Sequence, residues 1–382
     1  MIEQLVNFVR DYFQTDDFIP LHEPIFGGKE RRNVADAIES TFVSSVGNFV
    51  QRFEQEVEAY SGAESAIATV NGTAALHTAL LLAGVQSGDL VITQPLTFVA
   101  TCNAISYCGA EPVFVDVDMD TMGLSATALG NWLEDNAEIC EDGLCRLIAN
   151  KKIIRACVPM HTFGHPADVK GLTTVADKWR LTLVEDASES LGSFYSGQHT
   201  GTFGSLGTLS FNGNKIITTG GGGMILTSLD LGKRGKHITT TAKMPHPYEY
   251  IHDEVAFNYR LPNLNAALGC AQLEQIENFV ASKRALAKQY KSLFARSSME
   301  FFSEPENCRS NYWLSAVICE DRVQRDELLR ETNKLGIMTR PVWRLMHHSA
   351  MFHKCLKGDL SNAEWLGARV VSLPSSAVSE KK

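Results

Sequence analysis

The sequence predicts an α/β fold in which helices cover both faces of a mostly parallel central sheet. Between about residues 65 and 228, short apolar and β-branched runs alternate with helical patterns. This alternation is typical of parallel strands joined by helical crossovers. The expected strands are Ser65–Val70, Leu90–Gln94, Val113–Asp118, Ile154–Met160, Leu181–Asp186 and Met224–Thr227, and the expected helices include Thr73–Leu82 and Lys170–Lys178.

A smaller α+β part is expected after the sheet. Asn265–Arg296 has one long helical pattern, and a strand at Asn311–Cys319 and a helix at Asp321–Leu335 follow it. We therefore divide the chain into a large domain, residues 1–264, and a small C-terminal domain, residues 265–382. The large domain includes an amphipathic N-terminal helix, Met1–Phe13, and the last residues, Ser379–Lys382, are expected to be disordered.

Composition excludes several classes of protein. The chain has 382 residues and a net charge of -9, which argues against a nucleic-acid-binding protein. It contains no apolar run of the ~20 residues needed to cross a bilayer and no export signal. The nine cysteines form no C-x-x-C pair, so neither a zinc site nor a disulfide framework is expected. A cytoplasmic protein without membrane or nucleic-acid partners is the expectation.

Three segments at expected strand ends carry the chemistry. Asn71-Gly72-Thr73 begins a helix whose free N–H groups suit a phosphate, Asp186 ends an apolar strand, and Lys215 precedes the run Gly220–Gly223. Each alone has an ordinary explanation: a capped helix, a salt bridge, a surface lysine. Together they match the requirements of an aldehyde cofactor with a pyridine ring and a phosphate.

The segments NGTAALHTAL, PLTFVATCNAI, VEDASESLGS, SFNGNK and NYRLPNLNAALGCAQLE resemble the DegT/DnrJ/EryC1/StrS sugar aminotransferases. These are fold-type I enzymes dependent on pyridoxal phosphate (PLP), with pyridoxamine phosphate as the intermediate form. FVSSVGNFVQRFE, VPMHTFGHP and TRPVWRLMHHSAMF resemble a narrower branch, which makes UDP-4-amino-4,6-dideoxy-N-acetylglucosamine on routes to legionaminic acid and bacillosamine-type sugars. The resemblance implies a UDP-2-acetamido-2,6-dideoxy-4-keto-hexose as substrate and glutamate as amino donor.

The resemblance also implies roles for individual residues. Lys215 would hold the cofactor as a Schiff base and shuttle the proton, while Asp186 would hold the pyridinium nitrogen. Asn258 would reach the phosphate of the neighbouring subunit, which implies a homodimer with shared sites. The remaining implied cofactor contacts are Gly72, Thr73 and Ser210 at the phosphate, Phe98 on the ring and Glu189 near it. His161, Arg340 and Trp343 are candidate substrate contacts.

Alternatives stay open at this point. Relatives that are pyridoxamine-phosphate-dependent sugar dehydratases carry His where this chain has Lys215, which favours an aminotransferase. Asp116 and Asp118 could form the D-x-D metal motif of a glycosyltransferase. His161 could also be a buried core histidine. For His347-His348 we favour a surface or nucleotide-edge role over a metal site, because adjacent residues point in different directions.

Overall fold

The computed structural model describes residues 1–378, so the expectation for Ser379–Lys382 lies outside the described residues. Its centre is a seven-stranded sheet of order β1-β11-β10-β7-β6-β2-β3. All strands run in the same direction except β11, which is antiparallel to both neighbours, so the predicted mostly parallel sheet is confirmed. The strands are β1 Ser65–Thr69, β2 Leu90–Thr93, β3 Glu111–Phe114, β6 Ile154–Val158, β7 Thr182–Asp186, β10 Leu206–Ser210 and β11 Gly223–Thr227.

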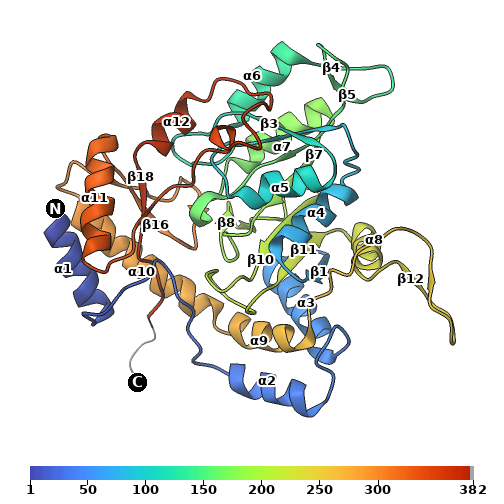
Figure 1. The fold of residues 1–382 in the computed structure, drawn as a ribbon, viewed down its shortest axis with the longest axis horizontal. Helices are drawn as coiled ribbons and strands as arrows, with labels where there is room; N and C mark the ends of the chain where they lie inside the picture. The colour runs from blue at the N-terminus through green and yellow to red at the C-terminus, as the bar shows by residue number, and fades with distance from the viewer. Residues whose placement is uncertain (379–382) are drawn as a thin grey trace.

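Helices cover both faces of this sheet (Figure 1). One face packs against α4 Gly72–Leu82, α5 Val99–Tyr107 and α8 Leu229–Thr239, and the other against α3 Asn48–Ser61, α6 Ala126–Asn136, α7 Val169–Trp179 and α9 Asn263–Leu273. Side chains alternate along each strand: Val184 joins the α4–α5 cluster, whereas Leu183 joins the α6–α7 cluster. Burial on both faces explains why the strands are almost continuously apolar in sequence.

The C-terminal part has its own four-stranded sheet, of order β14-β16-β18-β17. It consists of β14 Glu300–Phe301, β16 Ser315–Ile318, β17 Arg340–Pro341 and β18 Val370–Leu373, with helices α10 Ile276–Phe294 and α11 Arg322–Lys334. The predicted strand at Asn311–Cys319 is shortened at its start. Tyr312 has a left-handed backbone (φ 46°). The backbone N–H of Asn311 donates to the Ser193 hydroxyl at 2.9 Å instead of to a strand neighbour, and its side-chain amide donates to the Glu189 and Leu191 carbonyls.

Shorter elements complete the described chain. They are α2 Glu30–Glu39, the hairpin β4 Ala137–Ile139 with β5 Cys145–Leu147, the small sheet of β8 Phe194–Tyr195, β9 Gln198–His199 and β15 Cys308–Arg309, the pair β12 Lys243–Met244 and β13 Ile251–His252, the 3₁₀ turns η1 Thr162–Gly164 and η2 Met346–His348, and α12 Ser361–Gly367. The segment that carries β12 projects from the body as an arm (Figure 1).

The predicted single helix Asn265–Arg296 is wrong, because the structure has two helices that break at Glu274 and Gln275. Side-chain contacts hold the break: Gln275 donates to Glu30 at 2.7 Å, and Glu274 pairs with Lys29 and Arg52. The break lets α9 pack against α2 and α3 while the second half of α10 packs against the C-terminal sheet. The sequence gives no Gly or Pro there to signal it.

The predicted boundary at residue 265 stays a prediction, but packing departs from it at both ends. The helix α1 Ile2–Phe13 buries Leu5, Val6 and Val9 in the C-terminal core, next to Tyr290 and Val317. Figure 1 shows α1 beside α10 and α11, away from the large sheet. Conversely, α9 belongs to the core of the large sheet.

Within residues 1–378, none of the helices combines the length and hydropathy that crossing a membrane requires.

We expect Leu5→Ala to lower the free energy of unfolding by about 2–5 kcal/mol, because the side chain is fully buried in the C-terminal core. Urea denaturation would measure the change. Gln4→Ala, on the exposed side of the same helix, is the matched control and should change stability by less than about 0.5 kcal/mol. Equal effects of both substitutions would contradict the packing of α1.

Candidate active site

A cavity of about 300 Å³ lies at the edge of the large sheet where the parallel strands end. It is lined by segments that follow β1, β2, β6, β7 and β10 and precede β11, together with Trp313 and Trp343 from the C-terminal part. Ligands of open parallel sheets bind beyond this edge. The lining includes eight of the residues to which the sequence assigned a cofactor or substrate contact: Gly72, Thr73, Phe98, Asp186, Glu189, Ser210, Lys215 and Trp343.

The start of α4 and the end of β10 form a cradle suited to a phosphate. Asn71 accepts from the Ala74 N–H at 2.8 Å and caps the helix, so the ordinary explanation of this residue is confirmed. Gly72 and Thr73, in the first turn, face the cavity with N–H groups that a helix leaves without partners. A Cβ on Gly72 would lie 2.9 Å from the Cβ of Ser210, so glycine permits this close approach.

The glycine run closes the other side of the cradle. A Cβ on Gly223 would lie 2.5 Å from the Asn71 carbonyl oxygen, because β11 packs directly against the start of α4. Gly220 has a left-handed backbone with φ 79°, a conformation that favours glycine. The run thus allows dense backbone packing around the cavity, as predicted.

Asp186 ends β7 with its side chain buried at the cavity wall. Its Oδ2 accepts from the Thr101 hydroxyl at 2.7 Å, and its Oδ1 accepts from the Ser188 N–H at 3.2 Å. No ion pair joins Asp186 to a basic side chain within residues 1–378. A buried carboxylate with two neutral donors fits a protonated pyridine nitrogen as its charged partner.

Lys215 lies in the same cavity, next to Glu189. Its Nζ is 3.2 Å from Glu189 Oε1 and 4.1 Å from the centre of the Trp313 ring. The lysine side chain is only 12% exposed, so the alternative of a solvated surface lysine is wrong. Trp313 is fixed in turn by a hydrogen bond from its Nε1 to the Asn214 carbonyl, at 2.6 Å.

Burial raises the pKa of Glu189 to about 7, although the Lys215 ammonium and the Phe163 N–H both lower it. That N–H donates to Glu189 Oε2 at 3.0 Å. Phe163 holds this position with a left-handed backbone, φ 56°, which is uncommon for a bulky residue and costs energy. The local strain therefore serves to place a donor at the second oxygen of Glu189.

A second cavity, of about 420 Å³, adjoins the first. Both are lined by Asn214, Trp313 and Trp343, and the rings of Phe98 and Trp343 lie 6.4 Å apart. Arg340 lines only the second cavity, together with His22, whose Nδ1 is buried without a partner.

Sequence reasoning assigned no role to several of these residues. Thr101 and Asn214 lie inside the quoted segments PLTFVATCNAI and SFNGNK, and Trp313 lies inside the expected strand Asn311–Cys319, so only the segments pointed to them. His22 lies in a segment near the N-terminus that no motif marked.

The structure contradicts the expectation that His161 contacts the substrate. His161 is fully buried, pairs through Nε2 with Glu185 at 3.0 Å, and accepts at Nδ1 from the Ala167 N–H. Burial raises the pKa of Glu185, but hydrogen bonds from His161, Gly204 and Gly201 outweigh it and the net pKa is lowered. His161 is therefore a core histidine that stabilises a buried carboxylate.

Asp116 accepts from the N–H groups of Asn362 and Ala363, both at 2.8 Å, so it caps α12 and does not form a D-x-D metal site with Asp118.

Asn258 is exposed, accepts from Arg260 Nε at 2.9 Å and does not line the cavity of its own chain. Its reach to a partner's phosphate stays a prediction.

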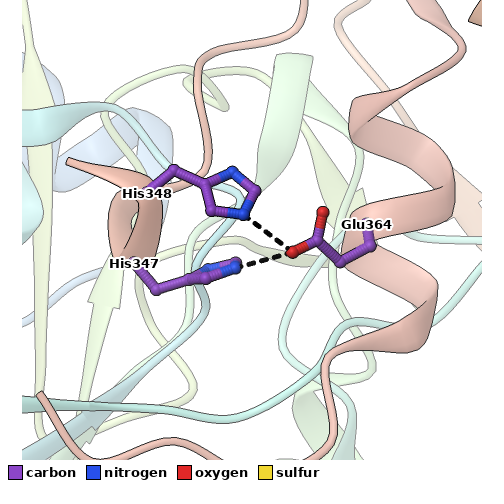
Figure 2. Close-up of side chains that lie close together, drawn as sticks. All are labelled: His347, His348 and Glu364. Atoms are coloured by element: carbon purple, nitrogen blue, oxygen red, sulfur yellow. Dashed lines mark hydrogen bonds and ion pairs between the residues drawn. The ribbon is translucent and has the colours of Figure 1, made fainter. Parts of the chain in front are cut away.

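The expectation that His347 and His348 point in different directions is wrong. Both rings turn toward Glu364, with their Nε2 atoms 2.8 and 2.9 Å from the same Oε1 (Figure 2). The 3₁₀ turn η2 and the length of the imidazole side chains let two adjacent residues converge on one carboxylate.

A mostly parallel sheet with a buried lysine, a buried carboxylate and a phosphate cradle at one edge is typical of PLP-dependent transferases. The chain belongs to the DegT/DnrJ/EryC1/StrS aminotransferase family, which it matches over residues 24–381. It is a PLP-dependent sugar aminotransferase, as the sequence resemblance predicted.

Individual relatives agree with this assignment. GDP-perosamine synthase of Escherichia coli O157:H7 is 37% identical over 360 residues, covering 94% of this chain and 93% of the relative. The crystal structure of a DegT DnrJ EryC1 StrS aminotransferase from Brucella abortus matches with a TM-score of 0.81 and 25% identity, covering 91% and 90% of the two chains. A Streptococcus pneumoniae protein solved in its PLP form shares the fold, with a TM-score of 0.84, 22% identity and coverage of 96% and 95%.

The raised pKa of Glu189 predicts a pH-dependent stability of the cofactor-free protein. Between about pH 4.5 and pH 7 the folded state keeps a proton that the unfolded chain has lost, so stability falls as pH rises. The free energy of unfolding of the wild type should therefore fall between these pH values by up to about 3 kcal/mol more than that of Glu189→Gln, which has no carboxyl group at this position to titrate. Urea unfolding of both proteins at pH 5 and pH 8 would measure it, and parallel pH profiles would contradict the raised pKa.

Proposed function

We propose that the protein transfers an amino group from glutamate to the 4-keto carbon of UDP-2-acetamido-2,6-dideoxy-4-keto-hexose. The product would be a UDP-linked 4-amino-4,6-dideoxy-N-acetyl sugar, for bacterial surface glycans. The observation that carries the proposal is the position of Lys215, in a cavity that fits PLP and adjoins a second cavity able to hold an extended substrate.

The residues of the first cavity have separate tasks. When bound, PLP supplies an aldehyde that carries the amino group and a ring that withdraws electrons. Gly72, Thr73 and Ser210 would hold its phosphate. Asp186, oriented by Thr101 and Ser188, would keep the ring nitrogen protonated, and Phe98 would cover the ring.

Lys215 would hold the cofactor and then, once released, move a proton to and from the reacting carbon. Glu189 and Trp313 restrict the amine to one place, through the 3.2 Å ion pair and the 4.1 Å contact with the ring. This confinement orients the amine, which is the condition for efficient proton transfer.

The second cavity supports a nucleotide-linked substrate. Its walls are largely apolar, with Pro20, Leu21, Phe163 and Trp343 among them, and Arg340 and Arg344 also line it. No salt bridge occupies either arginine within residues 1–378, and guanidinium groups suit the oxygens of a diphosphate. His22, with its unpartnered Nδ1, could contact a sugar hydroxyl or amide.

A GDP-linked keto-sugar is the second candidate, because the Escherichia coli relative is named for GDP-perosamine. The alternative of a pyridoxamine-phosphate-dependent dehydratase is less well supported, since Lys215 occupies the position that is His in those relatives. The two candidate substrates differ in the nucleotide base and in the 2-acetamido group of the sugar, so a comparison of the two as substrates separates the proposals.

Purified enzyme should aminate the UDP-linked keto-sugar with a kcat/KM at least tenfold above that for a GDP-linked 4-keto-6-deoxy sugar. Glutamate conversion to 2-oxoglutarate would measure turnover. Arg340→Ala should raise KM about tenfold or more with little change in kcat, whereas Arg330→Ala on the exposed helix α11 is the control. A preference for the GDP-linked sugar would overturn the UDP assignment and keep the aminotransferase.

Borohydride treatment of the holoenzyme should attach the cofactor to the peptide that contains Lys215. Lys215→Ala should lower turnover by about 10²–10⁴-fold or more. Lys283 is the informative control, because it is also buried and burial holds its pKa well below the usual value. Peptide mass spectrometry would locate the label, and a label on Lys283 would refute the role of Lys215.

We also propose that the enzyme is a homodimer with shared sites. Asn258 stands at the base of the projecting arm, where Thr240 and Asn258 form a β-bridge. The arm exposes large side chains to an extent unusual for a free surface: Tyr248 is 83%, Tyr250 81% and Val255 94% exposed. Such a segment favours burial against a second subunit.

Mixing the inactive variants Lys215→Ala and Asn258→Asp under subunit exchange should restore activity in part, because one site of a mixed dimer combines an intact Lys215 with an intact Asn258. Native mass spectrometry would verify exchange. If mixed dimers form and stay inactive, Asn258 acts within its own subunit.

A further inference from the structure

Two histidines and a glutamate converge on one point, separate from the cofactor cavity. His347 Nε2 lies 2.8 Å and His348 Nε2 2.9 Å from the same oxygen, Glu364 Oε1. The two imidazole rings are 4.2 Å apart, and one ligand atom from each of the three residues falls within 4.8 Å of the others. Figure 2 shows both rings directed at the carboxylate from the η2 turn, opposite α12.

The scaffold holds these side chains in place without a ligand. The Met346 N–H donates to the Pro95 carbonyl at 2.9 Å, which fixes the η2 turn to the large domain. Asp116 caps α12 through its first N–H groups, which fixes the helix that carries Glu364. His347 is 5% exposed and packs against Phe114, so its ring needs little further ordering to bind an ion.

The donor set and its charge favour a divalent transition metal. An ion placed between the two Nε2 atoms and Glu364 Oε1 would meet two nitrogen ligands and one anionic oxygen. Two imidazole nitrogens and one carboxylate oxygen are a common zinc set that leaves a position for water. Calcium and magnesium prefer oxygen ligands alone.

We propose that His347, His348 and Glu364 form a Zn²⁺ site that ties the η2 turn to α12. Arg322 and Arg325 line a third cavity together with His348 and Glu364. Both arginines pair with Asp326, which reduces their repulsion of a metal ion at this site. Arg344 donates to the His348 carbonyl oxygen, on the backbone side of that residue.

The site matters because of what precedes it in the chain. Arg340, Trp343 and Arg344 line the substrate cavity, and the η2 turn begins only two residues after Arg344. A metal at the end of this segment would restrain the wall of the substrate cavity from outside. The inference does not depend on the proposed substrate.

The test uses chelator-treated holoenzyme and Zn²⁺ as the probe, followed by isothermal titration calorimetry. We expect one ion per chain, and we expect His348→Ala and Glu364→Gln each to weaken binding at least tenfold. His353→Ala, an exposed histidine five residues further on, is the matched control and should bind like the wild type. Both test residues are about half-exposed, so their variants should fold, and circular dichroism would verify this.

Two other zinc ligand sources must be distinguished. His237, Asp253 and Glu254 form a second cluster at the base of the arm, and the chain has free cysteines. Cobalt substitution should give a spectrum without a sulfur-to-metal band, and His237→Ala should leave binding unchanged. Absence of zinc binding, loss of binding on His237→Ala, or wild-type affinity in folded His348→Ala would each overturn the proposal.

Discussion

The common direction of β7 and β10 is the constraint on which the active site depends. In their parallel register Thr208 lies beside Asp186, so Ser210 extends just beyond the carboxylate. The strand β11 runs the opposite way, yet its first residue, Gly223, pairs with both Ser210 and Thr69 at this edge. Residues separated by more than a hundred positions in the chain thereby form one cradle.

Electrostatic balance inside the cavity follows from this geometry. Asp186 and Glu189 are both buried, three residues apart, but they face different partners: two neutral donors hold Asp186, whereas Lys215 and a strained backbone N–H hold Glu189. Burying two carboxylates is expensive unless each is compensated. The different partners explain how one strand end can offer a charged group to a ring nitrogen and still confine an amine.

The sequence predicted the sheet, its direction and most of the first cavity, because strand patterns and glycine-rich turns are local signals. It failed where function depends on contacts between distant segments. His161 follows a strand toward the expected site, yet the buried Glu185 pulls it into the core. Trp313 and His22 reach the cavities from the C-terminal part and from the N-terminal segment. The hydrophobic periodicity of the sequence does not predict contacts between such distant segments. The break between α9 and α10 depends on Glu30, which lies over two hundred residues earlier.

The position of α1 has a consequence for how the chain becomes native. Its apolar face is completed by Leu286, Tyr290, Phe301 and Val317, residues synthesised long after α1 and after all the strands of the large sheet. Helix α1 therefore lacks its partners while the large sheet can already assemble. During that interval Leu5, Val6 and Val9 form an exposed apolar stripe on a nascent chain, which is the kind of surface that chaperones bind.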